Sequence, residues 1–229
     1  MDARIVPAGD AAWLVELPER IDPVVNARAI EIAAGVTRLA LPFVLDVVVG
    51  YRSVMVYVDP VADGAETIAG RLDSILADSE PESVAQGRSV EVPVCYDARF
   101  GPDLSDVAAF GRCSAEEVIE RHLAVEYRVF VVGFVPGFAY LAPVDPRIAA
   151  PRRLSPRVKV PRGSVAIAAG QTGIYPAETP GGWNLIGRTP VRPYAPDRSE
   201  PFLLRAGDLV RFRRIGESEY RAATEWDDL

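Results

Sequence analysis

The spacing of apolar positions changes near residue 80 of this 229-residue chain. Before that point, strand-like stretches at 4–17, 44–51 and 53–60 alternate with helix-like stretches at 22–41 and 63–79. The two strands at 44–60 follow each other closely enough to pair as a hairpin. This arrangement predicts a small α/β sandwich with an antiparallel sheet over residues 1–80.

The first predicted helix carries an apolar stripe with a period of 3.6 residues. The stripe consists of Val25, Ala29, Ile32, Ala33 and Val36. Asp22 before Pro23 is a typical helix start, and Asp63 before Gly64 is expected to begin the second helix. The stripe therefore marks the face that we expect to pack on the sheet.

The polar segment 79–88 has no apolar period and is the best candidate for a linker. After it, residues 89–96 alternate like a strand, and 103–112 and 114–126 follow a helical period. Ser114 and Glu117 have the spacing of a capping box at the start of the second of these helices.

From residue 127 onward the pattern predicts strands and long loops but no clear helix, ending in a strand-like stretch at 206–215. Nine of the 20 prolines lie within 134–192. Because repeated proline prevents helix and restricts the backbone to extended or turn conformations, we expect this part of the chain to form a β-barrel or sandwich with rigid loops.

Composition excludes several classes of protein. Hydrophobic residues make up 49% and charged residues 25% of the chain, as in globular domains, and no apolar run is long enough for a membrane span. The N-terminus lacks a signal pattern, so we expect a cytoplasmic protein. With two cysteines and one histidine, neither a disulfide framework nor a metal site is expected.

Charge is distributed unevenly along the chain. The net charge of −7 argues against nucleic acid as the main partner. Residues 134–192, however, contain eight basic and two acidic side chains, a local net charge of +6. This basic island indicates a local anion site or a surface for an acidic partner, unless its charges are simply solvated in loops.

Two stretches of this island carry candidate chemistry. In 134–141, Phe134, Phe138 and Tyr140 surround a Pro136-Gly137 turn, which indicates either a packed β-corner or rings presented to a ligand. In 150–164, prolines stiffen a track of basic residues that suits phosphate, carboxylate or an acidic neighbour. The basic residues of this track are Arg152, Arg153, Arg157, Lys159 and Arg162.

The stretch 170–190 is rich in glycine and proline and has only two charged residues. Its residues 182–189 resemble a phosphate-binding loop with Arg188 in place of lysine, but Pro190 and Pro193 rule out the helix that such a loop requires. We interpret the stretch instead as one wall of a small-ligand pocket completed by a partner. The alternative is an aromatic-centred interface that never contacts substrate.

In the pocket interpretation, Trp183 offers a flat apolar face and Arg188 faces negative charge. Hydrogen bonds to an amide and a carboxylate would come from Gln171, Thr172, Asn184 and Thr189. The remaining members of the predicted wall are Gly173, Tyr175, Gly181 and Gly182.

His122 is the only histidine, near the end of a predicted helix. It is expected either to serve as a helix C-terminal charge or packing residue, or to take part in an anion-binding or interface surface.

Five motifs together resemble the KipI/PxpB family, also labelled allophanate hydrolase subunit 1 or the B subunit of 5-oxoprolinase. They are FGPDL (100–104), EEVIERH (116–122), YRVFVVGFVPGFAYL (127–141), PRRLSPRVKVPRGSVAIAAGQTGIYP (151–176) and TPGGWNLIGRTP (179–190). The resemblance begins at about residue 85. It implies an α+β chain in which a small α/β domain, 1–80, precedes a cyclophilin-like β-barrel domain, 81–229.

The resemblance also implies a function within a complex. Members of the family are subunits of an ATP-dependent 5-oxoprolinase that opens 5-oxoproline to L-glutamate, with a larger KipA/PxpC-type subunit and a LamB/YcsF-type (PxpA) protein. ATP and Mg²⁺ are implied for the complex, the isolated chain is expected to be inactive, and the catalytic residues are not identified. The alternatives are a urea- or allophanate-processing enzyme and a KipI-type inhibitor of a histidine kinase.

Overall fold

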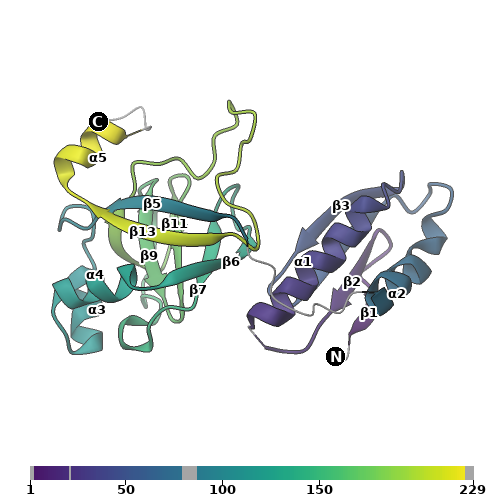
Figure 1. Cartoon of the computed structure of the whole chain (residues 1–229), viewed down its shortest axis with the longest axis horizontal. Coiled ribbons are helices and arrows are strands. Elements are labelled where there is room, and N and C mark those ends of the chain that lie inside the picture. Colours follow the sequence, from purple (N-terminus) through teal and green to yellow (C-terminus); the bar gives the residue numbers. More distant parts are fainter. Residues whose placement is uncertain (1–2, 21, 79–86, 225–229) are drawn as a thin grey trace. The chain divides into compact units, whose positions relative to one another are not determined.

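The computed structural model describes residues 3–20, 22–78 and 87–224. The chain divides into two compact units, Met1–Gln86 and Gly87–Leu229 (Figure 1). Most of the predicted linker at 79–88 lies outside the described residues. Within the described ranges, no helix combines the length and the apolar character needed to cross a bilayer.

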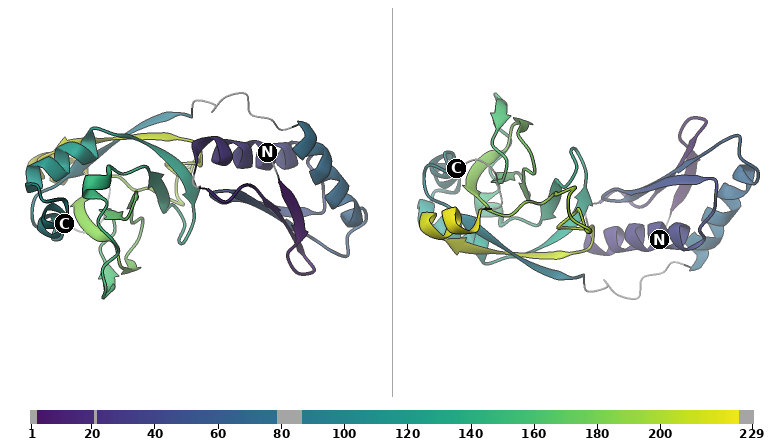
Figure 2. Two further views of the ribbon diagram at one scale, coloured as in Figure 1. Left: turned by 90° about the horizontal axis from the view of Figure 1, so that it is seen from below. Right: turned by 90° about the horizontal axis from the view of Figure 1, so that it is seen from above.

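The first unit is an antiparallel sheet with the strand order β1-β2-β4-β3 and with α1 packed along one face (Figure 2). Its elements are β1 (Arg4–Pro7), β2 (Ala12–Glu16), α1 (Pro23–Arg38), β3 (Val44–Val49), β4 (Ser53–Val58), the 3₁₀ helix η1 (Ala65–Thr67) and α2 (Ile68–Asp78). The small α/β sandwich with an antiparallel sheet is therefore confirmed.

Helix α1 begins as the sequence predicts. The Asp22 carboxylate accepts hydrogen bonds from the backbone N–H groups of Val24 at 2.8 Å and Val25 at 3.3 Å. All members of the apolar stripe are buried in the core of this unit, and α1 contacts β3 and β4. The stripe from Val25 to Val36 thus fixes which face of α1 packs on the sheet.

Two expectations for this unit are wrong in detail. The strand expected at 4–17 is a hairpin of β1 and β2, in which Gly9 at φ 75° lies in the turn. The helix expected at 63–79 begins with a 3₁₀ turn, and the residue before that turn is Gly64 at φ 87°, so Asp63 does not cap it. An alternating pattern does not show where a strand folds back on itself.

In the described residues of the second unit, seven strands close into a barrel in the order β10-β7-β6-β13-β5-β12-β9. Its elements are β5 (Ser89–Cys95), α3 (Leu104–Gly111), α4 (Ala115–Leu123), β6 (Glu126–Val132), β7 (Ala139–Ala142), η2 (Pro146–Ile148), β8 (Arg157–Val160), β9 (Ser164–Ala168), β10 (Gln171–Ile174), β11 (Thr179–Gly181), β12 (Asn184–Arg188), β13 (Leu209–Ile215) and α5 (Glu217–Ala223). The predicted α+β class with a β-barrel is confirmed.

The barrel strands present one set of side chains to the interior and the alternate set outward. In β9, Val165 and Ile167 belong to the main interior cluster, whereas Ala166 and Ala168 belong to a second apolar cluster outside the barrel wall. Strands β8 and β11 form a separate two-stranded sheet, and Val160 of β8 lies in that second cluster. Residues of this second cluster form the candidate site described below.

Helices α3 and α4 contact each other (Figure 1). The capping box before α4 is confirmed, because the Glu117 N–H donates to Ser114 Oγ at 3.1 Å and the Ser114 N–H donates to the Glu117 carboxylate at 2.9 Å. The expectation of no helix after residue 127 is wrong for η2 and α5. Helix α5 is too short to show a period, and its buried ring, Tyr220, lies 4.5 Å from the Phe100 ring.

Candidate functional site

Phe138 is the centre of an aromatic cluster on the outer side of the barrel wall. Its ring centroid lies 4.8 Å from Tyr140, 5.1 Å from Tyr175, 5.4 Å from Trp183 and 5.7 Å from Phe134, each with edge-to-face geometry. Such contacts stabilise a fixed ring arrangement beyond the area that the rings bury. The structure thus joins the aromatic corner at 134–140 to the Gly/Pro-rich stretch at 170–190.

A cavity of about 250 Å³ opens beside this cluster. It is lined by Phe134, Phe138, Tyr140, Arg152, Pro156, Tyr175, Pro180, Gly181, Gly182 and Trp183. All of them except Pro156 and Pro180 were predicted from the sequence to bind substrate or an anion. We call this cavity the aromatic pocket.

Phe134, at the rim of the aromatic pocket, has an unusual backbone conformation. Its φ is 72°, in the left-handed region that bulky residues rarely adopt, and 63% of its surface is exposed. Strained residues of this kind concentrate at functional sites, where the surrounding structure holds them in place. The ring of Phe134 is therefore available to an incoming ligand or partner.

Gly181 is required by the close approach of the pocket wall to Tyr175. A Cβ at this position would lie 2.4 Å from the Tyr175 hydroxyl oxygen, closer than any real contact. A Cβ on Gly173 would lie 2.9 Å from the Ala139 carbonyl oxygen and 3.1 Å from the Phe138 ring. Gly173 and Gly181 thus let strands and rings approach one another, while Gly181 and Gly182 also line the pocket.

Arg152 supplies the positive charge at the aromatic pocket. Burial raises the pKa of the Tyr140 and Tyr175 hydroxyls, and the nearby Arg152 guanidinium opposes part of that rise at both residues. Both phenols remain protonated near neutral pH and keep an O–H to donate. The pocket therefore combines flat apolar faces with one cation and two hydroxyl groups.

Several predicted site residues support the pocket walls and do not line it. The Asn184 amide donates to the carbonyl oxygens of Pro151 at 2.9 Å and Ile167 at 3.2 Å, and the buried Thr172 hydroxyl donates to Ala166 O at 3.0 Å. Pro136 and Gly137 form the turn between β6 and β7, and Gln171 begins β10.

Arg188 and Thr189 lie at the far end of β12, away from the lining residues. Arg188 Nε donates to the carbonyl oxygen of Arg162 at 2.8 Å, and Thr189 is fully buried. Because residues 184–188 form a strand, the structure agrees with the rejection of a phosphate-binding loop. Arg188 does not line the aromatic pocket, where Arg152 is the arginine among the lining residues.

The basic track at 152–162 does not act as one surface. The Asp103 carboxylate accepts hydrogen bonds from Arg153 at 2.8 Å and from Arg157 at 2.7 Å, and Lys159 pairs with Glu178 at 2.9 Å on the exposed side of β8. The anion that Arg153 and Arg157 bind is thus a residue of this chain. Sequence reasoning missed Asp103, although it lies in the FGPDL motif.

His122 does not form an anion-binding or interface surface, because it is fully buried. Its Nε2 is 2.9 Å from Thr172 Oγ1, its Nδ1 is 2.8 Å from Tyr96 Oη, and its ring stacks on Phe212 at 4.6 Å. Burial lowers the pKa of His122 to about 3, so the imidazole is neutral. Of the two predicted roles, packing is the one that the structure supports.

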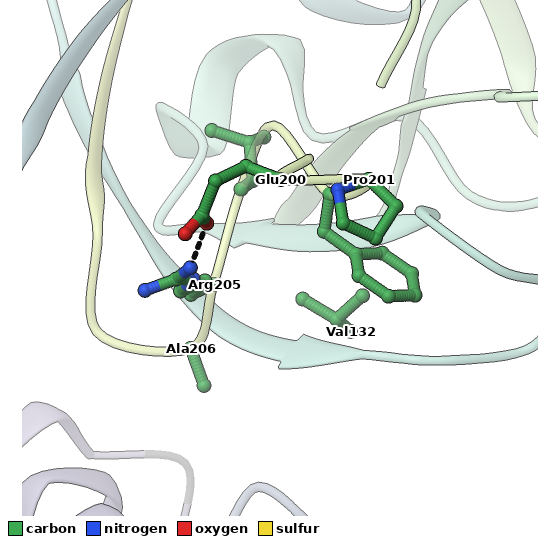
Figure 3. A pocket seen from close by; sticks show the side chains of 7 residues that line it. Val132, Glu200, Pro201, Arg205 and Ala206 are labelled. Atoms are coloured by element: carbon green, nitrogen blue, oxygen red, sulfur yellow. Dashed lines mark hydrogen bonds and ion pairs between the residues drawn. The ribbon is translucent and has the colours of Figure 1, made fainter. Parts of the chain in front are cut away.

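Another cavity, of about 270 Å³, lies beside β6 near the loop that precedes β13 (Figure 3). Val132, Pro201, Phe202, Leu204 and Ala206 supply its apolar lining. The carboxylate of Glu200 and the guanidinium of Arg205 pair with each other at its edge. No residue from the motifs at 151–190 lines this cavity, so the aromatic pocket is the better candidate.

The sequence of this chain is similar to those of known proteins along most of its length. Residues 3–204 match the family model of the carboxyltransferase domain, subdomains C and D. The chain is 40% identical to the 5-oxoprolinase B subunit of Bacillus subtilis, with 97% of each chain covered, and 41% identical to the 5-oxoprolinase B subunit of Escherichia coli O157:H7, with 92% of this chain and 95% of the relative covered.

Three solved structures are similar to this chain in fold, two of them also in sequence. The chain is 41% identical to the protein TTHA0988, with a TM-score of 0.79 over 89% of this chain, and it spans 40% of the length of that protein. It is also 41% identical to PH0987 from Pyrococcus horikoshii, with a TM-score of 0.57, 95% of this chain and 100% of that one covered. Kluyveromyces lactis urea carboxylase shares the fold at 20% identity, with a TM-score of 0.78 over 96% of this chain and 22% of that one. The chain therefore belongs to the family of 5-oxoprolinase B subunits, within the carboxyltransferase domain family of subdomains C and D.

Proposed function

We propose that this chain is the PxpB-type subunit of an ATP-dependent 5-oxoprolinase that opens 5-oxoproline to L-glutamate, and that its aromatic pocket binds the substrate. The observation that carries the proposal is the near-complete match, at 40–41% identity, to relatives named as 5-oxoprolinase B subunits. The subunit works with a larger KipA/PxpC-type subunit and a LamB/YcsF-type protein. The isolated chain is inactive in this proposal.

The aromatic pocket suits the chemistry of 5-oxoproline, which has a flat lactam and a carboxylate. The rings of Trp183 and Phe138 supply apolar faces for the planar amide, and the Arg152 guanidinium suits the carboxylate. The hydroxyl groups of Tyr140 and Tyr175 are donors for the lactam oxygen, because their raised pKa values keep them protonated. These residues bind and orient the substrate.

The lining of the aromatic pocket does not fit Mg²⁺ or the triphosphate of ATP. Mg²⁺ prefers carboxylate and phosphate oxygens, and none of the lining residues is Asp or Glu. A single arginine faces the pocket, and the glycine-rich residues at 182–189 lead along a strand instead of into a helix N-terminus. We place ATP and Mg²⁺ in the complex outside this pocket and assign them no step on this chain.

A second function is suggested by one relative. The chain is 30% identical to a putative urea carboxylase of Emericella nidulans over 62% of this chain and 12% of the relative. Urea and allophanate also present a planar N–C=O group to an aromatic pocket. A urea- or allophanate-processing enzyme is therefore the alternative to a 5-oxoprolinase.

The decisive experiment is to assemble this chain with the other subunits from the same organism and to measure L-glutamate release. We expect release only when 5-oxoproline and ATP are both present, and none from the chain alone. Consumption of urea or allophanate without glutamate formation would support the alternative. An intact complex that turns over none of these substrates would contradict both functions.

A further inference from the structure

Asp103 is a buried carboxylate to which the proposed function gives no role. Only 2% of its surface is exposed, just before α3. Oδ1 accepts hydrogen bonds from Arg153 Nη1 at 2.8 Å and Arg157 Nη2 at 2.7 Å, and Oδ2 accepts one from the Leu185 N–H at 2.7 Å. The Asp103 N–H in turn donates to the Leu185 carbonyl at 3.0 Å. One carboxylate thus joins the start of α3, strand β12 and the segment 151–157.

The approach of Asp103 to β12 depends on the neighbouring Gly101. A Cβ on Gly101 would lie 2.3 Å from the carbonyl oxygen of Ile186, a distance that real atoms do not reach. Gly101 therefore lets the backbone lie against β12, and Asp103 extends from there to the two arginines. Within the FGPDL motif, Gly101 thus allows the close backbone approach and Asp103 binds the two arginines.

The segments that Asp103 joins also form one side of the aromatic pocket. The Arg153 N–H donates to the Gly182 carbonyl at 2.8 Å, and the Asn184 amide donates to the Pro151 carbonyl at 2.9 Å. Arg152 lies between these two anchored residues and lines the pocket, whereas the side chain of Arg153 is directed to Asp103. These two neighbouring arginines therefore have different surroundings, Arg153 at Asp103 and Arg152 at the pocket.

We infer that Asp103 is a positioning residue that holds Arg152 toward the aromatic pocket through its ion pairs with Arg153 and Arg157. This inference rests on the proposed function, because it assumes that Arg152 binds the substrate. Without the carboxylate, two partly buried guanidinium groups lose their buried counter-ion, and the exposed Asp106 stays beside Arg153. The segment 151–157 then rearranges, and the Arg152 guanidinium no longer lies where it can bind the substrate.

A double-mutant cycle in the assembled enzyme tests the inference. The variants are Asp103→Asn, Arg152→Ala and the combination of both, with Asp106→Asn as a matched control because Asp106 lies 3.6 Å from Arg153 but is 68% exposed. We expect Asp103→Asn to raise KM for 5-oxoproline about tenfold with a smaller change in kcat, since small misplacements weaken binding strongly. In the Arg152→Ala background the same change should raise KM less than about twofold.

The inference would be overturned if Asp103→Asn raised KM equally in both backgrounds, or left KM unchanged in a folded complex. Chemical rescue adds a readout that general destabilisation would not move. In Asp103→Ala, added formate should restore KM toward the wild-type value by occupying the vacated carboxylate position, and acetate should restore it less. Absence of rescue at a concentration that leaves the wild type unaffected would count against the inference.

Hydrogen exchange separates this inference from the proposed function. In Asp103→Asn the amides of 152–155, 157 and 182–185 should exchange faster, while those of β5 and β13 keep their protection. If the wild-type complex shows no 5-oxoprolinase activity, the proposed function fails, but the exchange measurement still tests the attachment of these segments by Asp103. Unchanged protection of both segments would refute that attachment.

Discussion

Protonation of His122 should be strongly coupled to folding, and the chain offers a clean test because His122 is its only histidine. Thr172 Oγ1 donates to Ala166 O, so its hydroxyl accepts from His122 Nε2–H, and His122 Nδ1 accepts from the Tyr96 hydroxyl. Both ring nitrogens are thus satisfied in the neutral form. Burial lowers the pKa of His122 from 6.5 to about 3. As the pH falls, the unfolded chain therefore binds a proton at His122 at a higher pH than the folded chain does.

The sign and size of the effect follow from this pKa. Between pH 6.5 and 3 the unfolded state binds a proton at His122 that the folded state does not, so the free energy of unfolding falls as pH falls. Each unit of pKa difference is worth about 1.4 kcal/mol. The loss is about 2 kcal/mol between pH 7 and pH 5, and it approaches about 5 kcal/mol below pH 3.

Two measurements check this prediction. The single imidazole resonance in a proton NMR spectrum should not titrate between pH 8 and 5, and urea unfolding of His122→Gln should show a smaller loss of stability over this range than the wild type. The difference in pH dependence between the two proteins isolates His122 from the carboxylates. An imidazole that titrates near pH 6.5, or equal pH dependence in both proteins, would refute the reasoning.

Three further substitutions test the pocket rim, the backbone contact beside β12 and a helix cap. Phe134→Asn suits the left-handed backbone, so stability should change by less than about 1 kcal/mol while KM for 5-oxoproline rises; an unchanged KM would show that the ring does not contact substrate. Gly101→Ala forces the backbone away from Ile186 and should lower the free energy of unfolding by about 1–3 kcal/mol. Gly216→Ala, a control position with open space around it, should leave the stability nearly unchanged. Equal losses of stability in the two variants would argue against the contact of Gly101 with Ile186. Ser114→Ala removes the capping box and should cost about 1 kcal/mol without changing KM, as urea unfolding and saturation kinetics will show.

Much of the fold is predictable from the sequence because its signals are local. The Asp22-Pro23 helix start, the stripe from Val25 to Val36 and the capping box at Ser114 and Glu117 each specify an element from within a few residues. Helix α5 escaped prediction because its position depends on tertiary contacts, such as that of Tyr220 with Phe100 and the ion pair of Glu217 with Arg99. The closure of the barrel likewise depends on strand pairs far apart in the chain, such as β5 with β13.

The candidate site is predictable in its residue types but not in their assignments. Aromatic rings and arginines near Pro and Gly indicated a pocket, and Phe138, Trp183 and Arg152 do meet there. The sequence offered no means of choosing between Arg152 and Arg188 as the pocket cation, because that choice depends on Asp103, about fifty residues away. A buried carboxylate that organises arginines looks, in sequence, like an ordinary helix start.

The most direct test of the account is saturation kinetics of the assembled enzyme with 5-oxoproline, comparing the wild type with Arg152→Ala and Arg147→Ala. Arg147 is a matched control in the same unit that lines neither cavity described above. We predict ATP-dependent glutamate release by the wild type. We also predict a rise in KM of about tenfold or more for Arg152→Ala, as expected for a lost charge-assisted hydrogen bond, and no change for Arg147→Ala. A wild-type complex that releases no glutamate, or an Arg152→Ala enzyme with wild-type KM and kcat, would contradict the account.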